Sequence, residues 1–185
     1  MRAELDPERA REILEQADLI WSAEQVASAV RRLAQEITAA LGDQNPLVLS
    51  VMGGAVVFTG QLLPLLSFPL DFDTLYVSRY RGNTSGADVQ WRIEPPERCR
   101  GRVVLVLDDI LDEGQTLAAI RERLLGAGTK AFHSAVLADK DIGQQKPIRP
   151  DFVGLTVPNR YVFGFGMDVY GAWRNLPAIY ALAQR

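Results

Sequence analysis

The sequence predicts an α/β fold of three layers, in which helices cover both faces of a mostly parallel sheet. Two observations predict this class. Short apolar runs bounded by turn residues alternate along the chain with segments of helical periodicity, an order typical of parallel sheets. The chain has 185 residues, of which 48% are hydrophobic, enough for one such domain and too few for two. We therefore expect a single domain over residues 1–185, with N-terminal helices in 1–45, a core in 46–139, and a hood with the C-terminal segment in 140–185.

The N-terminal third is expected to be helical. Pro7 can occupy the first turn of a helix that begins after Asp6. Ser22 precedes a long amphipathic stretch that ends at Leu41-Gly42, so we expect Ser22 to cap a second helix.

Strands and helices alternate through the rest of the chain. An apolar run leads through two glycines into a helix expected over residues 55–66, and a second strand–turn–helix unit has its helix over residues 115–125. The segment 78–87 is polar and rich in small residues, so we expect a mobile flap. Prolines break the tail, which we expect to form a small lobe over the active edge. The expected strands are residues 47–52, 69–77, 88–93, 103–107, 130–139 and 151–157.

Composition argues against several kinds of site and partner. The formal net charge of −3 provides no broad basic surface for nucleic acid. A single cysteine, Cys99, excludes an internal disulfide, and its charged neighbours predict a surface turn. A single histidine, His133, leaves neither a histidine metal cluster nor a Ser/His/Asp triad.

Hydropathy argues against a membrane protein. No window contains the roughly 18 uninterrupted apolar residues that a spanning helix needs. The first residues are polar and acidic, unlike a secretory signal. We therefore expect a cytoplasmic protein with neither a membrane nor a nucleic acid as partner.

The run 103–117 carries the residues on which a functional prediction depends. Five apolar residues are followed by Asp108 and Asp109, and then Asp112 and Gly114 lead into the helix. In a strand–loop–helix unit this loop lies at the carboxyl edge of the parallel sheet, where N–H groups at the helix start attract phosphate. Adjacent carboxylates suit ribose hydroxyls or a hydrated divalent cation. The alternative is a plain strand end in which the acids only cap the helix.

In order and spacing, this run resembles the phosphoribosyl diphosphate motif of the type I phosphoribosyltransferases. The resemblance implies that Asp108 and Asp109 hold the ribose and a metal ion, and that Asp112 exchanges a proton with N7 of a purine. It also implies a cradle of backbone N–H groups for the 5′-phosphate. Glu113 stands where the family often has a small hydroxyl residue, and we expect its side chain to point outward. The cradle residues are Asp112, Glu113, Gly114, Gln115 and Thr116.

Two further segments resemble loops of the same family. Met52, Gly53 and Gly54 match the loop that binds diphosphate through main-chain N–H groups, although purine members often have a lysine in place of Met52. Arg79-Tyr80 matches the flexible loop, whose tyrosine closes over the reaction centre and excludes water, so Tyr80 is expected to be catalytic. The alternatives are an ordinary strand-to-helix turn and a surface hairpin with an exposed tyrosine.

The tail resembles the purine-binding hood of hypoxanthine-guanine phosphoribosyltransferases. The resemblance implies that Lys140 donates to the 6-oxo group of the base, that Tyr161 stacks on the base and that Val162 contributes main-chain hydrogen bonds. Asp168 is implied at the purine site and as a third metal ligand, and Arg174 as a diphosphate ligand. Taken singly, each of these residues also has an ordinary structural role open to it.

Together these matches imply Mg²⁺-dependent transfer of the 5-phosphoribosyl group from phosphoribosyl diphosphate to N9 of hypoxanthine or guanine. The products would be IMP or GMP and diphosphate, in purine salvage. The family also implies the type I phosphoribosyltransferase fold with its hood and flexible loop, and a homodimer or homotetramer. Alternatives are a xanthine-guanine enzyme, a regulator of the same fold that binds nucleotide and RNA, and an adenine or pyrimidine enzyme. The acidic balance argues against the regulator, and Lys140 argues against the last class.

Overall fold

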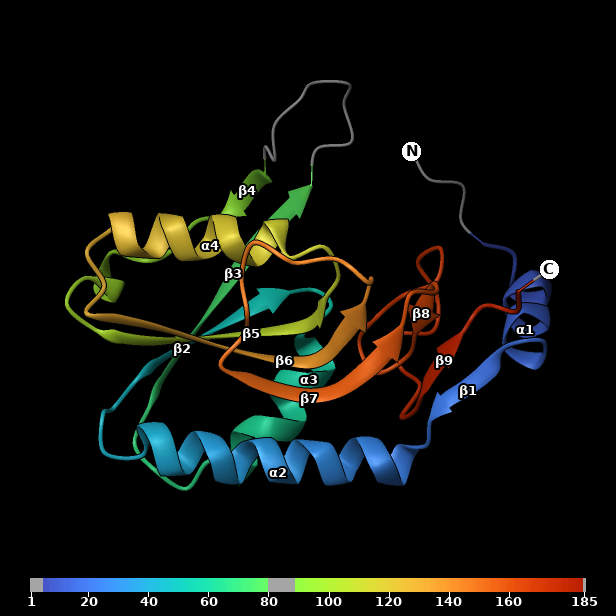
Figure 1. The fold of residues 1–185 in the computed structure, drawn as a ribbon, viewed down its shortest axis with the longest axis horizontal. Helices are drawn as coiled ribbons and strands as arrows, with labels where there is room; N and C mark the ends of the chain where they lie inside the picture. The colour runs from blue at the N-terminus through green and yellow to red at the C-terminus, as the bar shows by residue number, and fades with distance from the viewer. Residues whose placement is uncertain (1–4, 80–88, 185) are drawn as a thin grey trace.

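In the described part of the chain, a six-stranded sheet forms the centre of the protein, and Figure 1 shows it between helices. A computed structural model describes residues 5–79 and 89–184. The strands of the sheet are β2 (Leu47–Met52), β3 (Asp71–Arg79), β4 (Val89–Ile93), β5 (Val103–Leu111), β6 (Ala131–Asp141) and β7 (Phe152–Pro158). Their order is β4-β3-β2-β5-β6-β7, and all neighbours are parallel except β3 and the edge strand β4. The predicted mostly parallel sheet is confirmed.

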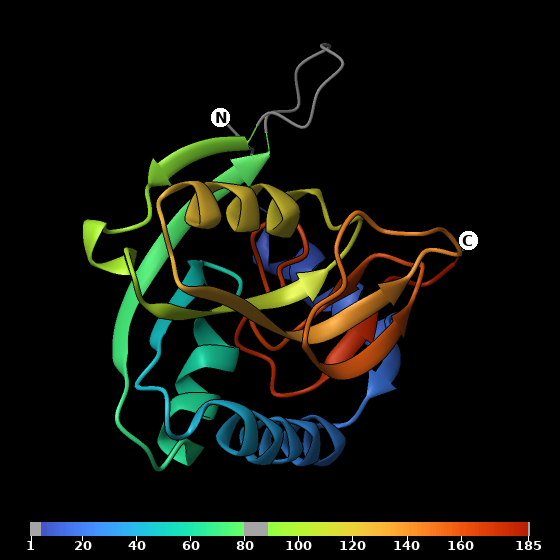
Figure 2. The ribbon, with the colours of Figure 1, turned by 60° about the vertical axis from the view of Figure 1, so that its left-hand side comes forward.

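Helices cover both faces of this sheet, as Figures 1 and 2 show. One face carries α2 (Ala23–Leu41) and α3 (Val56–Leu62), which continues into the 3-10 helix η1 (Leu63–Leu65). The other face carries α4 (Gln115–Gly126). The three-layer architecture is therefore confirmed.

The apolar run of β5 is buried on both faces. Leu105 and Leu107 belong to the core cluster that contains Leu33 of α2, whereas Val104 and Val106 belong to the cluster on the α4 side. Successive side chains of a strand point to opposite faces, so a strand covered by helices on both sides is apolar at every position. This burial fixes the strand that carries the acidic motif.

The strand β5 is longer than predicted. The prediction ended it at residue 107, because two carboxylates interrupt the apolar run there. Parallel pairing with β6 instead continues, with Asp108 opposite Val136 and Leu111 opposite Asp139. Backbone hydrogen bonds hold these residues in the sheet whatever their side chains, so the loop before α4 is only three residues long.

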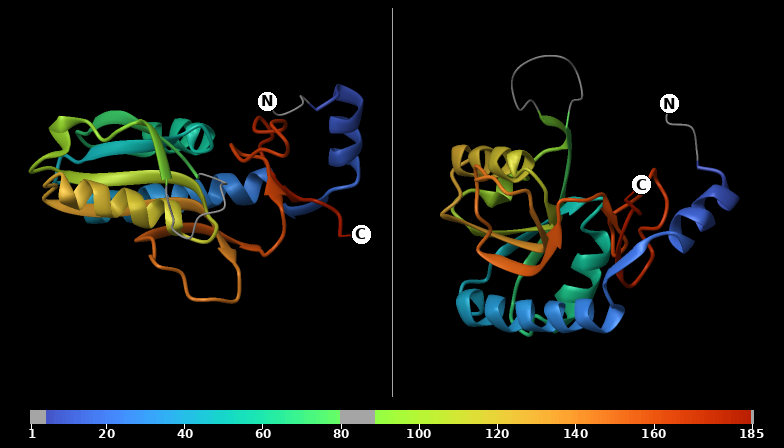
Figure 3. Two further views of the ribbon diagram at one scale, coloured as in Figure 1. Left: turned by 90° about the horizontal axis from the view of Figure 1, so that it is seen from above. Right: turned by 45° about the vertical axis from the view of Figure 1, so that its right-hand side comes forward.

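A smaller antiparallel sheet forms the hood at the carboxyl edge of the central sheet (Figures 1 and 3). Its order is β1-β9-β8, where β1 is Asp18–Trp21, β9 is Ile179–Ala181 and β8 is Val162–Phe163. The helix α1 (Pro7–Glu15) packs against it, because Ile13 and Phe163 share one apolar cluster. The hood is thus built from both ends of the chain.

The tail and the N-terminal third correct two predictions. The strand predicted at 151–157 exists as β7 but belongs to the central sheet and not to the small lobe. The strand β1 interrupts the predicted helical third; it is four residues long, and its partner β9 lies at the opposite end of the chain, so no local pattern indicates it. Both predicted helix starts are confirmed, with Asp6 capping α1 and Ser22 capping α2.

Two local predictions have different outcomes. Cys99 closes the 3-10 helix η2 (Glu97–Cys99), whose charged residues are exposed as a surface turn requires, but Cys99 itself is 1% exposed within the core cluster beneath α4 and is therefore not at the surface. Charged neighbours point outward there while the thiol packs inward. Of the predicted flap, residues 78 and 79 belong to β3, and the remainder, including Tyr80, lies outside the described residues.

Candidate active site

A cleft of about 590 Å³ opens at the carboxyl edge of β2, β3 and β5. It collects most of the residues predicted to bind phosphoribosyl diphosphate. These residues are Met52, Gly53, Gly54, Asp108, Asp109, Asp112, Gly114, Thr116 and Arg174, with Asp168 from the hood. Glu113 and Gln115 are exposed and are not among the lining residues, as expected for Glu113.

The turn after β2 lies directly against the acidic strand β5. A Cβ atom at Gly54 would collide with the carboxylate of Asp109, so only glycine fits that position. Gly166 of the hood has φ +101°, and a Cβ there would collide with the carbonyl oxygen of Gly54. The peptide bond between Met52 and Gly53 is cis. Three segments distant in the sequence therefore meet at one closely packed point.

Asp109 has an unusual electrostatic environment. Burial raises the pKa of its carboxyl group, against the opposing effects of hydrogen bonds with Asp108 and the Ile110 N–H and of the positive charge of Arg174. Its Oδ1 accepts from the Ile110 N–H at 2.9 Å, and its own N–H donates to Asp108 Oδ1 at 3.0 Å. A carboxylate that loses water in this way is stabilised by a bound cation.

The turn between β5 and α4 is short and places its glycine at the helix start. Gly114 precedes the first residue of α4 with φ +82°, a left-handed conformation that favours glycine. No side chain caps this helix. The positive end of the helix dipole therefore faces the cleft beside Thr116, an arrangement that suits a phosphate.

The hood contributes a tightly held ion pair to the cleft. Arg174 Nη2 donates to Asp168 Oδ1 at 2.6 Å, and Nη1 donates to the carbonyl of Gly166 at 2.6 Å. The other carboxylate oxygen of Asp168 accepts from the Gly171 N–H at 2.7 Å. The pair fixes a guanidinium at the cleft beside Gly166, whose backbone packs against Gly54.

The three predicted metal ligands do not form a preassembled metal centre. Within residues 5–79 and 89–184, no three His, Cys, Asp or Glu side chains are grouped so that they could hold an ion. The carboxylate of Asp168 pairs with Arg174 instead of joining Asp108 and Asp109. Asp108 and Asp109 remain adjacent on β5 in the cleft, and two carboxylates with substrate phosphates are a usual environment for Mg²⁺.

At the predicted purine end, Lys140 contacts Asp112. The Lys140 Nζ atom lies 3.2 Å from Asp112 Oδ1, and their side chains are 12% and 44% exposed. Lys140 comes from the end of β6 and lines a neighbouring cavity of about 520 Å³, whereas Asp112 lines the main cleft. The pair thus connects two adjoining hollows.

The aromatic candidate belongs to the hood. Tyr161 is 46% exposed and stacks on Tyr170, with ring centroids 5.8 Å apart and planes at 27°. Val162 follows it in β8 and is buried, and neither residue lines the main cleft. Of the predicted purine-binding residues, only Asp168 lines the main cleft, whereas Lys140, Tyr161 and Val162 lie beside it.

Sequence reasoning missed Lys146, Gly166 and Tyr170. The Gly-Phe-Gly pattern ending at Gly166 could have indicated a close backbone approach. Lys146 lies in a polar stretch between strands and had no distinguishing local signal. Its importance depends on contacts with β5 and β6 that only the fold creates.

A larger hollow of about 860 Å³ lies elsewhere, between α4 and the segment after β4. Its walls mix apolar residues such as Trp91 with acidic and basic side chains, and Arg123 pairs with Glu94 across it. It contains none of the predicted site residues. The smaller cleft, with its glycine turns and paired acids, is the candidate active site.

A parallel sheet with a glycine turn and two acids at its carboxyl edge, beside an arginine-bearing hood, is an arrangement typical of proteins that bind phosphorylated ligands. Residues 17–170 match the family model of the phosphoribosyl transferase domain. The chain belongs to the phosphoribosyltransferase family. Proteins of this family are glycosyltransferases, and this chain is one of them.

Two curated relatives cover most of the chain. The hypoxanthine-guanine-xanthine phosphoribosyltransferase of Tritrichomonas foetus is 34% identical over 162 residues, which are 87% of this chain and 88% of that protein. The hypoxanthine-guanine phosphoribosyltransferase of Lactococcus lactis is 35% identical over 164 residues, again 87% of this chain and 88% of the relative.

Solved structures show the same architecture. A hypoxanthine phosphoribosyltransferase from Staphylococcus aureus superposes with a TM-score of 0.86 at 25% identity, covering 93% of this chain and 95% of that one. A hypoxanthine-guanine phosphoribosyltransferase from Bacillus anthracis has a TM-score of 0.81 at 26% identity, covering 90% and 97%. None of the helices in the described segments is both long enough and apolar enough to cross a bilayer.

Proposed function

We propose that this chain is a purine salvage enzyme that transfers the 5-phosphoribosyl group from phosphoribosyl diphosphate to N9 of hypoxanthine or guanine, releasing diphosphate. The relatives from T. foetus and L. lactis carry the names of these purines and span most of the chain. The observation that carries the proposal is the contact of Lys140 with Asp112, at 3.2 Å beside the cleft. It sets a donor for a 6-oxo group next to a carboxylate able to exchange a proton with N7 of the base.

At the sugar end, the short turn before α4 receives the 5′-phosphate. Backbone N–H groups from Glu113 to Thr116, at the positive end of α4, provide the cradle, with the hydroxyl of Thr116 as a further donor. Asp108 and Asp109, which line the cleft, accept hydrogen bonds from the ribose hydroxyls in this proposal. The glycines of the β2 turn and the guanidinium of Arg174 then bind the diphosphate.

Mg²⁺ is the proposed cofactor, as it is for the family generally. When bound, it neutralises charge on the diphosphate leaving group. Asp108 and Asp109 would hold it, because the pKa of Asp109 is raised by burial and a cation would stabilise its charged form. Asp168 is a further proposed ligand, although both its oxygens already accept hydrogen bonds from Arg174 and Gly171.

The base is proposed to bind under the hood. Tyr161 stacks on it, Val162 offers main-chain groups and Asp168 lies beside it, while Lys140 donates to the 6-oxo oxygen. Tyr80 is proposed to close over the reaction centre and exclude water, as the family resemblance implies.

Xanthine is a second candidate acceptor, because the T. foetus relative has xanthine in its name and is similar to this chain over 162 residues. Xanthine differs from hypoxanthine at the 2-position and shares the 6-oxo group that Lys140 would recognise. The two candidates therefore need the same Lys140–Asp112 pair and differ elsewhere in the pocket.

One assay tests the reaction class and the acceptor together. Purified protein with Mg²⁺ and phosphoribosyl diphosphate is offered hypoxanthine, guanine, xanthine and adenine in turn, and nucleotide formation is followed by absorbance. We expect turnover with at least one 6-oxopurine and none with adenine. Turnover with adenine alone, or with no purine, would refute the proposal. The proposed oligomeric state is a homodimer or a homotetramer, which sedimentation in the same buffer would measure. The proposed location of the protein is the cytoplasm.

A further inference from the structure

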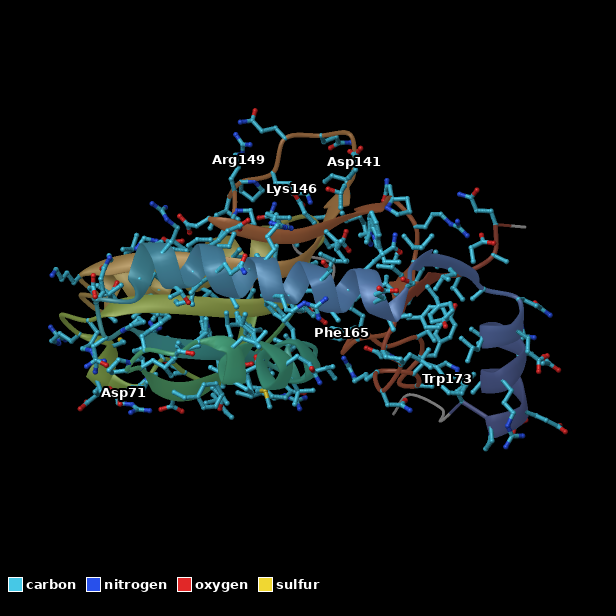
Figure 4. All side chains as sticks on the ribbon, turned by 90° about the horizontal axis from the view of Figure 1, so that it is seen from below. Asp71, Asp141, Lys146, Arg149, Phe165 and Trp173 are labelled. Carbon is cyan, nitrogen blue, oxygen red and sulfur yellow. The ribbon has the colours of Figure 1, made fainter. Side chains whose placement is uncertain are left out.

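The segment between β6 and β7, residues 142–151, crosses the ends of strands that carry the candidate active site. Figure 4 shows Lys146 and Arg149 on this segment and Asp141 where β6 ends. Lys146 differs from the other charged residues of this region because its ammonium turns inward, and its side chain is only 10% exposed.

Three acceptors surround the Lys146 ammonium. Its Nζ atom donates to the carbonyl of Leu111 at 2.8 Å, to the carbonyl of Lys140 at 2.6 Å and to Asp139 Oδ1 at 2.5 Å. A lysine ammonium has three N–H donors, so these contacts use all of them. Leu111 immediately precedes Asp112, and the second carbonyl belongs to Lys140 itself. One side chain therefore fixes the backbone at both members of the Lys140–Asp112 pair.

The same segment also rests on the proposed phosphate cradle. A Cβ atom at Gly114 would lie 3.3 Å from Pro147 Cδ and 3.4 Å from Lys146 Cβ, which leaves the turn little room to shift. The backbone of Gly114 is thus packed against Lys146 itself and against Pro147, the residue that follows it. The segment connects the end of β5, the end of β6 and the start of α4.

Lys146 and Lys140 have different ionic partners, and this difference indicates different roles. Lys146 pairs with Asp139, and Lys140 pairs with Asp112. Because the Lys146 donors are all engaged by protein atoms, it has none left for a purine oxygen. Lys140 is paired with Asp112, which is 44% exposed at the cleft, so its ammonium can turn toward a base that also engages Asp112.

We propose that Lys146 is a positioning residue that holds Asp112 and Lys140 in register for a 6-oxopurine without contacting the substrate. The proposal rests on the proposed function. Replacing the ammonium by a methyl-terminated chain leaves one carboxylate and two carbonyl oxygens without their donor, in a partly buried place. The ends of β5 and β6 then lose their common link, and the purine site is disturbed more than the diphosphate site.

The test compares Lys146→Met with Lys130→Met, which changes an exposed lysine immediately before β6. For Lys146→Met we expect the KM for hypoxanthine to rise about tenfold and the preference for hypoxanthine over adenine to fall about tenfold, with the KM for phosphoribosyl diphosphate changed less than about twofold. Lys146→Arg keeps a cation and should recover part of the purine KM. Lys130→Met should match the wild type in all three quantities.

Equal losses for both substrates, or a folded Lys146→Met enzyme with an unchanged purine KM, would overturn the proposal. If Lys146→Met fails to fold, Lys146→Gln, which keeps N–H donors, serves in its place, and the same split between substrates decides. Wild-type turnover separates the two proposals. A wild type inactive on every 6-oxopurine refutes the proposed function, whereas an active wild type with a Lys146 variant that matches Lys130→Met refutes only this inference.

Discussion

The ammonium of Lys140 and the carboxylate of Asp112 lie 3.2 Å apart, although they come from the ends of different strands. Asp112 directly follows the last residue of β5, and Lys140 lies near the end of β6, the parallel neighbour of β5. In parallel sheets the carboxyl ends of neighbouring strands meet at one edge, which is where ligands bind. The pair is therefore a product of topology, and each member can be tested separately.

Asp112→Asn should reduce turnover far more than it weakens substrate binding. The amide keeps the size of the side chain but cannot accept a proton from N7, and general acid–base help of this kind contributes about 10²–10⁴ in rate. We expect kcat to fall within that range while the dissociation constant of phosphoribosyl diphosphate, from calorimetry, changes less than about threefold. A variant with wild-type kcat would remove Asp112 from the chemistry.

Lys140→Met should act on the choice of base. The methionine has a similar length and no donor, so a 6-oxo group loses its partner while the sugar phosphate keeps all of its contacts. We expect kcat/KM for hypoxanthine to fall at least about tenfold, which corresponds to the loss of one charged hydrogen bond. Competition assays with all four purines measure this, and a uniform loss across the purines would contradict a role in specificity.

Much of the central sheet could be predicted because its cause is local. The β5 run is apolar at every position since both faces are covered, and the Asp6 and Ser22 caps mark helix starts in the sequence. The hood could not be predicted in the same way. Its strand β1 is four residues long and pairs with β9 at the other end of the chain, so its stability comes from a contact that no local window contains.

The candidate site divides along the same line. The acidic motif and the glycine turn are each a contiguous stretch of the sequence, so each could be predicted separately. The structure then brings the two stretches together in one cleft. Lys146 illustrates what a contiguous pattern cannot reveal, because its meaning comes from the carbonyl groups of Leu111 and Lys140. Main-chain acceptors have no signature in the side-chain sequence.

Gly54→Ala should abolish substrate and metal binding. The added methyl group would collide with the Asp109 carboxylate and force the β2 turn away from β5. Gly60→Ala is a matched control, since a Cβ atom there meets nothing within 4 Å and lies in α3, where alanine favours the helix by about 0.5–1 kcal/mol. Thermal shift with phosphoribosyl diphosphate and Mg²⁺ measures binding; a Gly54→Ala protein stabilised as strongly as the control would refute the packing argument.

Tyr80→Phe should slow turnover and leave ground-state binding nearly unchanged. The expectation follows from the family resemblance of Arg79-Tyr80, because Tyr80 itself lies outside the described residues. If a side chain acts only once the site has closed, its removal lowers kcat without changing the affinity of the open enzyme for its substrate. Stopped-flow and steady-state kinetics distinguish these quantities, and unchanged kinetics would show that the hydroxyl has no role in closure.

Cys99 should react slowly with thiol reagents in the folded protein. The side chain is 1% exposed, and burial raises the pKa of its thiol, so both access and thiolate fraction are low. We expect a chromogenic disulfide reagent at pH 8 to label the native protein at least about a hundredfold more slowly than the protein in denaturant.

The raised pKa of Cys99 also has a consequence for the stability of the fold. Because the unfolded thiol ionises first, near pH 8.5, the contribution of Cys99 is complete below that pH and is lost as the pH rises through the folded pKa. Cys99→Ala should remove this part of the alkaline decline, which denaturant titrations at pH 8 and pH 10 would measure, and a native thiol labelled as fast as the unfolded one would contradict its burial.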